Sequence, residues 1–77
     1  MLIEVFGPGC AKCQTLEKHA LQAVAKSGET HQVVKISDYA AMAARGVMST
    51  PALALDGQIK AQGKVISTDD ILALLKG

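Results

Sequence analysis

Two cysteines separated by two residues carry the clearest chemical signal in this sequence. They lie in the segment Cys10-Ala11-Lys12-Cys13, and the chain contains no other cysteine. On the first turn of a helix, thiols at this spacing lie close enough to form a disulfide. They can also bind a soft metal ion as thiolates. The spacing alone therefore leaves thiol–disulfide exchange and metal binding open.

A purely structural disulfide is a weak explanation for the pair. Joining Cys10 to Cys13 would close a loop of about four residues, which the chain-entropy relation values at roughly 2 kcal/mol. Residues 1–7 include an acid, Glu4, and lack both the basic start and the long apolar run of a secretory signal. We therefore expect a cytoplasmic protein, in a compartment that keeps thiols reduced, and a reactive pair.

The elements around the pair predict different roles for its two thiols. A strand over 2–6 ends at Gly7-Pro8-Gly9, and apolar residues at helical spacing follow over 10–26. Cys10 then begins the helix, where unpaired N–H groups and the helix dipole stabilise a thiolate. Cys13 lies one turn later on the apolar face, so we expect it to be less exposed. Cys10 is the expected nucleophile and Cys13 the resolving thiol.

The rest of the chain alternates strands and helices. Strands are predicted over 31–36, 52–55 and 58–62, and helices over 39–45 and 69–76. Asp56-Gly57 is a typical two-residue hairpin turn, Ser37 or Asp38 can cap the short helix, and Ser67 with Asp70 resembles a capping box. The order β-α-β-α-β-β-α predicts one α/β domain over 1–77, with a four-stranded mixed sheet flanked by helices. Its first two strands run parallel through a right-handed crossover.

Charge and composition narrow the range of partners. The net charge is +1, the basic residues are scattered, and one Tyr and one Phe provide no stacking platform. We therefore expect no nucleic-acid partner. No run approaches the roughly 18 apolar residues that a membrane span needs. The expectation is a monomer that does not bind membranes.

These features together resemble the thioredoxin and glutaredoxin superfamily, and more narrowly the small "redox-active disulfide protein 2" group of thioredoxin-like proteins. The resemblance rests on the cysteine segment over 7–13, on Gly-Val-Met-Ser-Thr-Pro-Ala over 46–52, and on Gly63 after the last strand. The element order agrees along the whole chain. The resemblance therefore implies that the predicted α/β fold is thioredoxin-like.

The resemblance also implies an activity and a binding surface. It implies a thiol–disulfide oxidoreductase with a redox-active Cys10–Cys13 disulfide and no further cofactor. A cis peptide bond would precede Pro51, which would face the cysteines. The main chain of Thr50 would pair with an extended substrate segment, with Gly63 on the same surface. The implied partners are protein disulfides and an NAD(P)H-linked disulfide reductase as electron donor.

Two charged residues are candidate modulators of the thiols. Lys12 places a cation between the cysteines. Glu4 lies mid-strand, where thioredoxins have a buried Asp that helps proton transfer at the second cysteine. A buried Glu4 could act as a base toward Cys13. The favoured expectation is instead a carboxylate that reaches solvent at the end of the sheet.

The alternative function is a soft-metal module in which Cys10 and Cys13 hold Cu(I), Zn or an arsenic species. Small copper-carrier domains end on a strand, whereas this chain ends on a predicted helix, and the metal interpretation does not explain Thr50-Pro51. His19 and His31 are expected to be solvated rather than metal ligands, because neither is placed to complete a tetrahedral site. We therefore expect no metal and favour redox chemistry.

Overall fold

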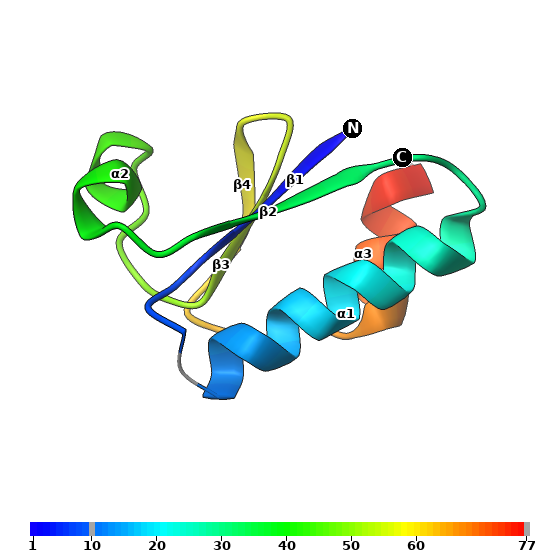
Figure 1. The fold of residues 1–77 in the computed structure, drawn as a ribbon, viewed down its shortest axis with the longest axis horizontal. Coiled ribbons are helices and arrows are strands. Elements are labelled where there is room, and N and C mark those ends of the chain that lie inside the picture. The colour runs from blue at the N-terminus through cyan, green and yellow to red at the C-terminus, as the bar shows by residue number, and fades with distance from the viewer. Residues whose placement is uncertain (10, 77) are drawn as a thin grey trace.

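The computed structural model describes residues 1–9 and 11–76. Within these ranges the chain forms the predicted succession of strands and helices (Figure 1). The elements are β1 (Leu2–Phe6), α1 (Ala11–Ser27), β2 (Gln32–Ile36), α2 (Tyr39–Ala44), β3 (Ala52–Leu55), β4 (Gln58–Gln62) and α3 (Thr68–Lys76). Each bound lies within one residue of its prediction, except that the predicted first residue of α1, Cys10, falls outside the described residues.

The four strands form one mixed sheet in the order β2-β1-β3-β4. β1 pairs in parallel with β2 and antiparallel with β3, and β3 pairs antiparallel with β4. β1 is therefore central, with a neighbouring strand on each side. The α/β class and the mixed four-stranded sheet predicted from the sequence are confirmed.

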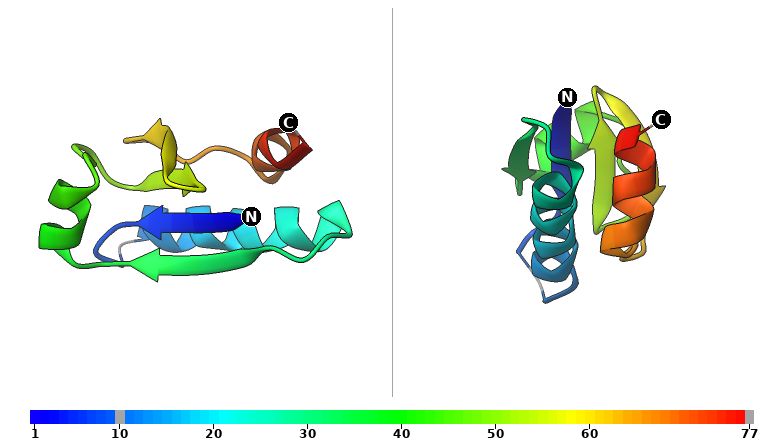
Figure 2. Two further views of the ribbon diagram at one scale, coloured as in Figure 1. Left: turned by 90° about the horizontal axis from the view of Figure 1, so that it is seen from above. Right: turned by 90° about the vertical axis from the view of Figure 1, so that its right-hand side faces the viewer.

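Alternate residues of β1 point to opposite faces of the sheet and pack against different helices. Ile3 and Val5 lie in a core with buried residues of α1 and α3. Phe6 packs on the other face, with Met42 of α2 and the small residues Ala52 and Ala54. Figures 1 and 2 show the same division, with α1 and α3 side by side and α2 well apart from them.

Local side-chain chemistry begins and ends these elements as predicted. Asp56 and Gly57 have φ values of 49° and 86°, the left-handed pair that a type I′ hairpin turn requires. The capping box forms in both directions: Asp70 N donates to Ser67 Oγ at 3.1 Å, and Ser67 N donates to Asp70 Oδ2 at 3.4 Å. At α2 the cap is Asp38, whose Oδ1 accepts from Ala40 N at 3.0 Å.

The hairpin turn and the start of the chain lie at one end of the molecule. Leu2 N donates to Asp56 Oδ1, and Asp56 N donates to Leu2 O, both at 2.8 Å. Met1 and the last turn of α3 lie near this end, whereas the loop after β1 lies at the opposite end (Figure 1). That opposite end carries the cysteine segment.

Candidate functional site

The loop over 7–9 carries the chain from the centre of the sheet to the start of α1. Gly7 N donates to Ile36 O at 2.9 Å, so the pairing of β1 with β2 continues into the loop. Cys10, the predicted nucleophile, lies outside the described residues. The geometry of the site is therefore built from the residues on either side of it.

Cys13 is buried, at 1% exposure, on the face of α1 that the helical pattern predicted. It lies directly against the main chain of Gly7. A Cβ added to Gly7 would overlap Cys13 Sγ and would lie 3.0 Å from Cys13 Cβ. The same Cβ would lie 4.0 Å from the Cα of Pro51. The main chain of Gly7 therefore lies next to both the Cys13 thiol and Pro51.

Pro51 begins the segment that enters β3, and its position matches what the resemblance implies. The Thr50–Pro51 peptide bond is cis, Pro51 is buried, and Thr50 is exposed. Pro51 O accepts a hydrogen bond from Gly63 N at 2.9 Å. Three residues predicted for substrate binding, Thr50, Pro51 and Gly63, are thus brought together beside Gly7.

The segment over 46–50 lies against the end of β4 and the residue that follows it. Met48 N donates to Gln62 Oε1 at 2.8 Å. A Cβ added to Gly63 would lie 3.2 Å from Ser49 Cβ, so a larger residue there would crowd the segment. The side chain of Met48 itself is 90% exposed.

Two lysines place positive charge near the cysteine segment. Lys12 is exposed in the first turn of α1, which contains no acidic residue. Lys35 Nζ lies 3.8 Å from the position of a Cβ added to Gly9. Sequence reasoning missed Lys35. The parallel register that pairs it with Val5 would have placed it near the loop.

Glu4 does not reach solvent, and the favoured expectation for it is wrong. Its side chain is only 3% exposed, because β1 is central and the chain around α2 covers this face. Arg45 compensates its charge through two short contacts, Nη1 to Oε1 at 2.7 Å and Nη2 to Oε2 at 2.6 Å. The sequence did contain a signal for this partner. Arg45 is the only basic residue between the predicted second and third strands, and a buried acid needs a counter-charge.

The histidines are less solvated than expected. His19 is half-buried, and its Nδ1 lies 2.9 Å from Ile66 O. The His31 side chain is 6% exposed, and neither of its ring nitrogens has a hydrogen-bond partner among the described residues. Over 1–9 and 11–76, no three His, Cys, Asp or Glu side chains are grouped as metal ligands.

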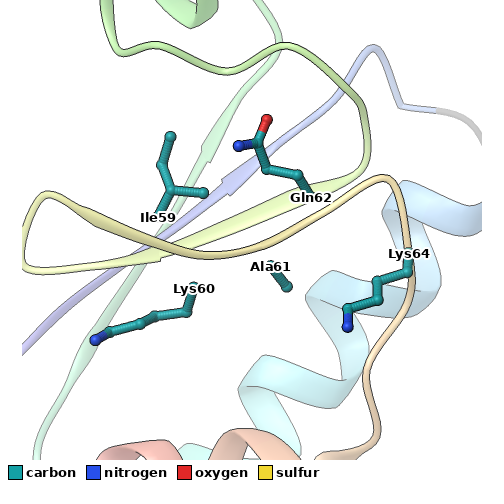
Figure 3. Close-up of a pocket in the computed structure, with 5 residues that line it drawn as sticks. All are labelled: Ile59, Lys60, Ala61, Gln62 and Lys64. Carbon is teal, nitrogen blue, oxygen red and sulfur yellow. The ribbon is translucent and has the colours of Figure 1, made fainter.

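A shallow pocket runs along β4, the outer strand of the sheet on this side (Figure 3). Ile59 and Gln62 point to one side of the strand, and Lys60 and Lys64 point to the other (Figure 3). The pairing of β3 with β4 shifts register between Leu53 and Ala54, so Lys60 is an extra residue in a bulge.

No helix in the described part of the chain is long and apolar enough to cross a membrane.

Comparison with known proteins gives consistent matches. A family model described as a thioredoxin domain matches residues 1–76. A thioredoxin of Methanothermobacter thermautotrophicus is 39% identical over 75 residues, which cover 97% of each chain. A thioredoxin of Methanocaldococcus jannaschii is 34% identical over 76 residues, which cover 99% of this chain and 87% of the relative.

One solved structure shows the same arrangement of strands and helices. It is described as the structure of a malarial protein, and it superimposes with a TM-score of 0.72. The match covers 97% of this chain and 92% of the other, at 18% sequence identity. At that identity the likeness concerns the fold alone.

Proposed function

The chain belongs to the thioredoxin domain family, and on that premise we propose that it is a thiol–disulfide oxidoreductase working through Cys10 and Cys13. We also propose that it belongs to the small redox-active disulfide protein 2 group, which its cysteine segment and its Thr50-Pro51 pair resemble. We further propose that residues 1–77 act as a single domain, as a monomer, in the cytoplasm. No cofactor beyond the cysteine pair enters this proposal.

The observation that carries the proposal is the position of Cys13. Its thiol is buried against Gly7, beside Pro51, and one helical turn after Cys10 in the sequence. A thiol in that position is shielded from attack by solvent-borne reagents but can reach a sulfur bonded to its neighbour in the motif. That is the requirement for a resolving thiol.

The reaction transfers two electrons to a partner protein. The Cys10 thiolate attacks one sulfur of the partner's disulfide and expels the other as a thiolate. Cys13, as a thiolate, then attacks Cys10 in the mixed disulfide and releases the second partner thiol. The products are a reduced partner and a Cys10–Cys13 disulfide, which an NAD(P)H-linked disulfide reductase returns to two thiols.

The partner segment is proposed to dock beside Pro51. Thr50 is exposed immediately before the proline, and Gly63 N, just after β4, donates a hydrogen bond to the carbonyl of Pro51. An extended segment of the partner would pair with the main chain of Thr50. Lys12, and Lys35 beside Gly9, add positive charge to the cysteine segment, and positive charge favours the thiolate form of a cysteine.

Redox titration tests the proposal. The protein is equilibrated in thiol–disulfide buffers of graded potential, trapped by alkylation, and its modified cysteines are counted by mass. We expect one reversible two-electron transition between about −180 and −300 mV. Cys13→Ser should accumulate mixed disulfide with a protein substrate, and Cys10→Ser should not.

A pair that never closes would overturn the redox proposal. The soft-metal alternative is tested on the same sample by titration with Cu(I), Zn²⁺ or arsenite. A tight 1:1 complex with a metal–thiolate absorption band, together with no redox transition, would establish it instead.

A further inference from the structure

Glu4 is the only charged residue that is buried in the part of the chain that the structure describes. Both of its carboxylate oxygens contact the guanidinium of Arg45, at 2.7 and 2.6 Å. This two-point contact fixes the orientation of both side chains, because the planar guanidinium matches the plane of a carboxylate. A lysine in place of Arg45 would offer a single point charge without that geometry.

The pair joins the two segments that build the site. Glu4 lies on β1, three residues before Gly7, against which Cys13 packs. Arg45 is the C-cap of α2, and the segment over 46–50 leads from it directly to Pro51. Arg45 N donates to Ala41 O at 3.1 Å, so the ion pair also holds the end of the helix.

Few other contacts hold α2 against the sheet. The helix has six residues, and Met42 is the only one of them that is buried. Val47 N donates to Met42 O at 2.9 Å, and the Val47 side chain packs against the core cluster that contains Phe6. The position of segment 46–50 relative to β1 therefore depends on the packing of Met42 and Val47, on the contacts of the segment with β4, and on the ion pair.

The geometry does not suit Glu4 to act as a base toward Cys13. One of the two oxygens that would accept a proton already accepts a hydrogen bond from the Arg45 guanidinium, and the other lies 2.6 Å from the same group. Glu4 shares the face of Phe6 and α2, whereas α1, which carries Cys13, packs on the face of Ile3 and Val5. The carboxylate and the helix of the resolving thiol thus lie on opposite faces of β1.

We propose that Glu4 and Arg45 are a positioning pair that holds segment 46–50 in the orientation in which it docks protein disulfides, and that Glu4 is not the proton acceptor for Cys13. The proposal rests on the proposed function of the same site. The pair then affects how well a protein partner binds, and it does not set the intrinsic reactivity of the thiols.

Steady-state kinetics on two substrates tests this assignment. The substrates are insulin, a protein with disulfides, and dithiobis(nitrobenzoate), a small disulfide that needs no docking segment. For Arg45→Met we expect KM for insulin to rise about tenfold, since small displacements of a positioning segment cost up to 10²-fold. The value of kcat and the rate with the small disulfide should stay within about twofold of wild type. Arg45→Lys should recover part of the loss, and Lys18→Met, which removes an exposed charge on α1, should behave as wild type.

Two further measurements separate the possible outcomes. Amide hydrogen exchange should be faster over 46–50 in Arg45→Met and unchanged over α1, which excludes general unfolding as the cause. Glu4→Gln should leave the pH profile of exchange with the small disulfide unchanged. A shifted profile, an unchanged KM for insulin, or an equal loss on both substrates would overturn the positioning role. If the wild-type protein reduced neither substrate, the proposed function itself would fail. Faster amide exchange over 46–50 in Arg45→Met would still show that the Glu4–Arg45 pair holds this segment in place.

Discussion

At the scale of single residues, the site depends on Gly7, because a glycine has no side chain to fill the space beside its main chain. Cys13 Sγ occupies the space that a Cβ of Gly7 would need, and the Cα of Pro51 lies 4.0 Å from the same position. The buried thiol therefore packs directly against the main chain of Gly7. Sequence reasoning interpreted Gly7 only as the end of a strand, because a contact between a backbone and a distant thiol leaves no periodic pattern.

Gly7→Ala is expected to destabilise the protein and to displace Cys13. Forcing an extra carbon into a packed site costs about 1–3 kcal/mol, and urea unfolding of the reduced protein measures it. Alkylation of Cys13 in a Cys10→Ser background should also become faster. Gly28→Ala is the control: an added Cβ there meets nothing within 4 Å, so only the cost of its φ of 71°, about 1 kcal/mol, applies. Slower or unchanged alkylation of Cys13 would contradict the packing argument.

At the scale of elements, the sequence predicted what is local and missed what joins distant segments. The bounds were accurate because hydrophobic period, capping residues and the Asp56-Gly57 turn all act within a few positions. Arg45 and Lys35 were missed as site residues, since each meets its neighbour only after the strands have paired. Burial of Glu4 was judged wrongly because no local pattern shows which strand is central.

The two histidines make different contributions to joining the elements. His19 on α1 lies within hydrogen-bond distance of Ile66 O, in the segment before α3. His31, between α1 and β2, is buried with neither ring nitrogen bonded among the described residues. One imidazole therefore connects two elements. The other forms no hydrogen bond among the described residues, and its Nε2 lies 3.9 Å from Glu29 Oε1.

His19→Leu and His31→Leu are expected to change stability differently. The first removes a hydrogen bond and leaves Ile66 O without its partner, which costs about 1 kcal/mol. The second replaces a buried imidazole that forms no hydrogen bond by an apolar group of similar size, and the distant contact with the exposed Glu29 contributes little, so stability should stay unchanged or rise. Urea midpoints of the two variants and the wild type, measured in the same buffer, provide the comparison. A larger loss for His31→Leu than for His19→Leu would refute this difference.

At the scale of the whole molecule, the sheet has two outer strands, β2 and β4, available to other chains. Exposed edges of this kind are templates for pairing with another copy, and charges and bulges protect against it. On β4, Lys60 supplies a charge at the edge of the sheet and is also the extra residue of the bulge, and its side chain is exposed (Figure 3). The proposal of a monomer therefore depends on this residue as well as on the size of the chain.

Lys60→Ile is expected to promote self-association. Sedimentation velocity across a concentration series should show the wild-type protein at one mass and the variant shifting to higher mass. Lys18→Ile, which places the same apolar side chain on the exposed surface of α1, should remain at the mass of the wild type. Equal association of both variants would mean that added hydrophobic surface, rather than the strand edge, is responsible.

The bond between Leu2 and the hairpin turn at Asp56 has a practical consequence for handling the protein. It anchors the start of the chain at the end of the molecule that lies opposite the loop over 7–9 (Figure 1). A fluorophore, an affinity handle or a solid support joined ahead of Met1 through a flexible spacer would face away from incoming disulfides. The protein can thus be immobilised on a bead or electrode with the attachment point away from the proposed docking surface.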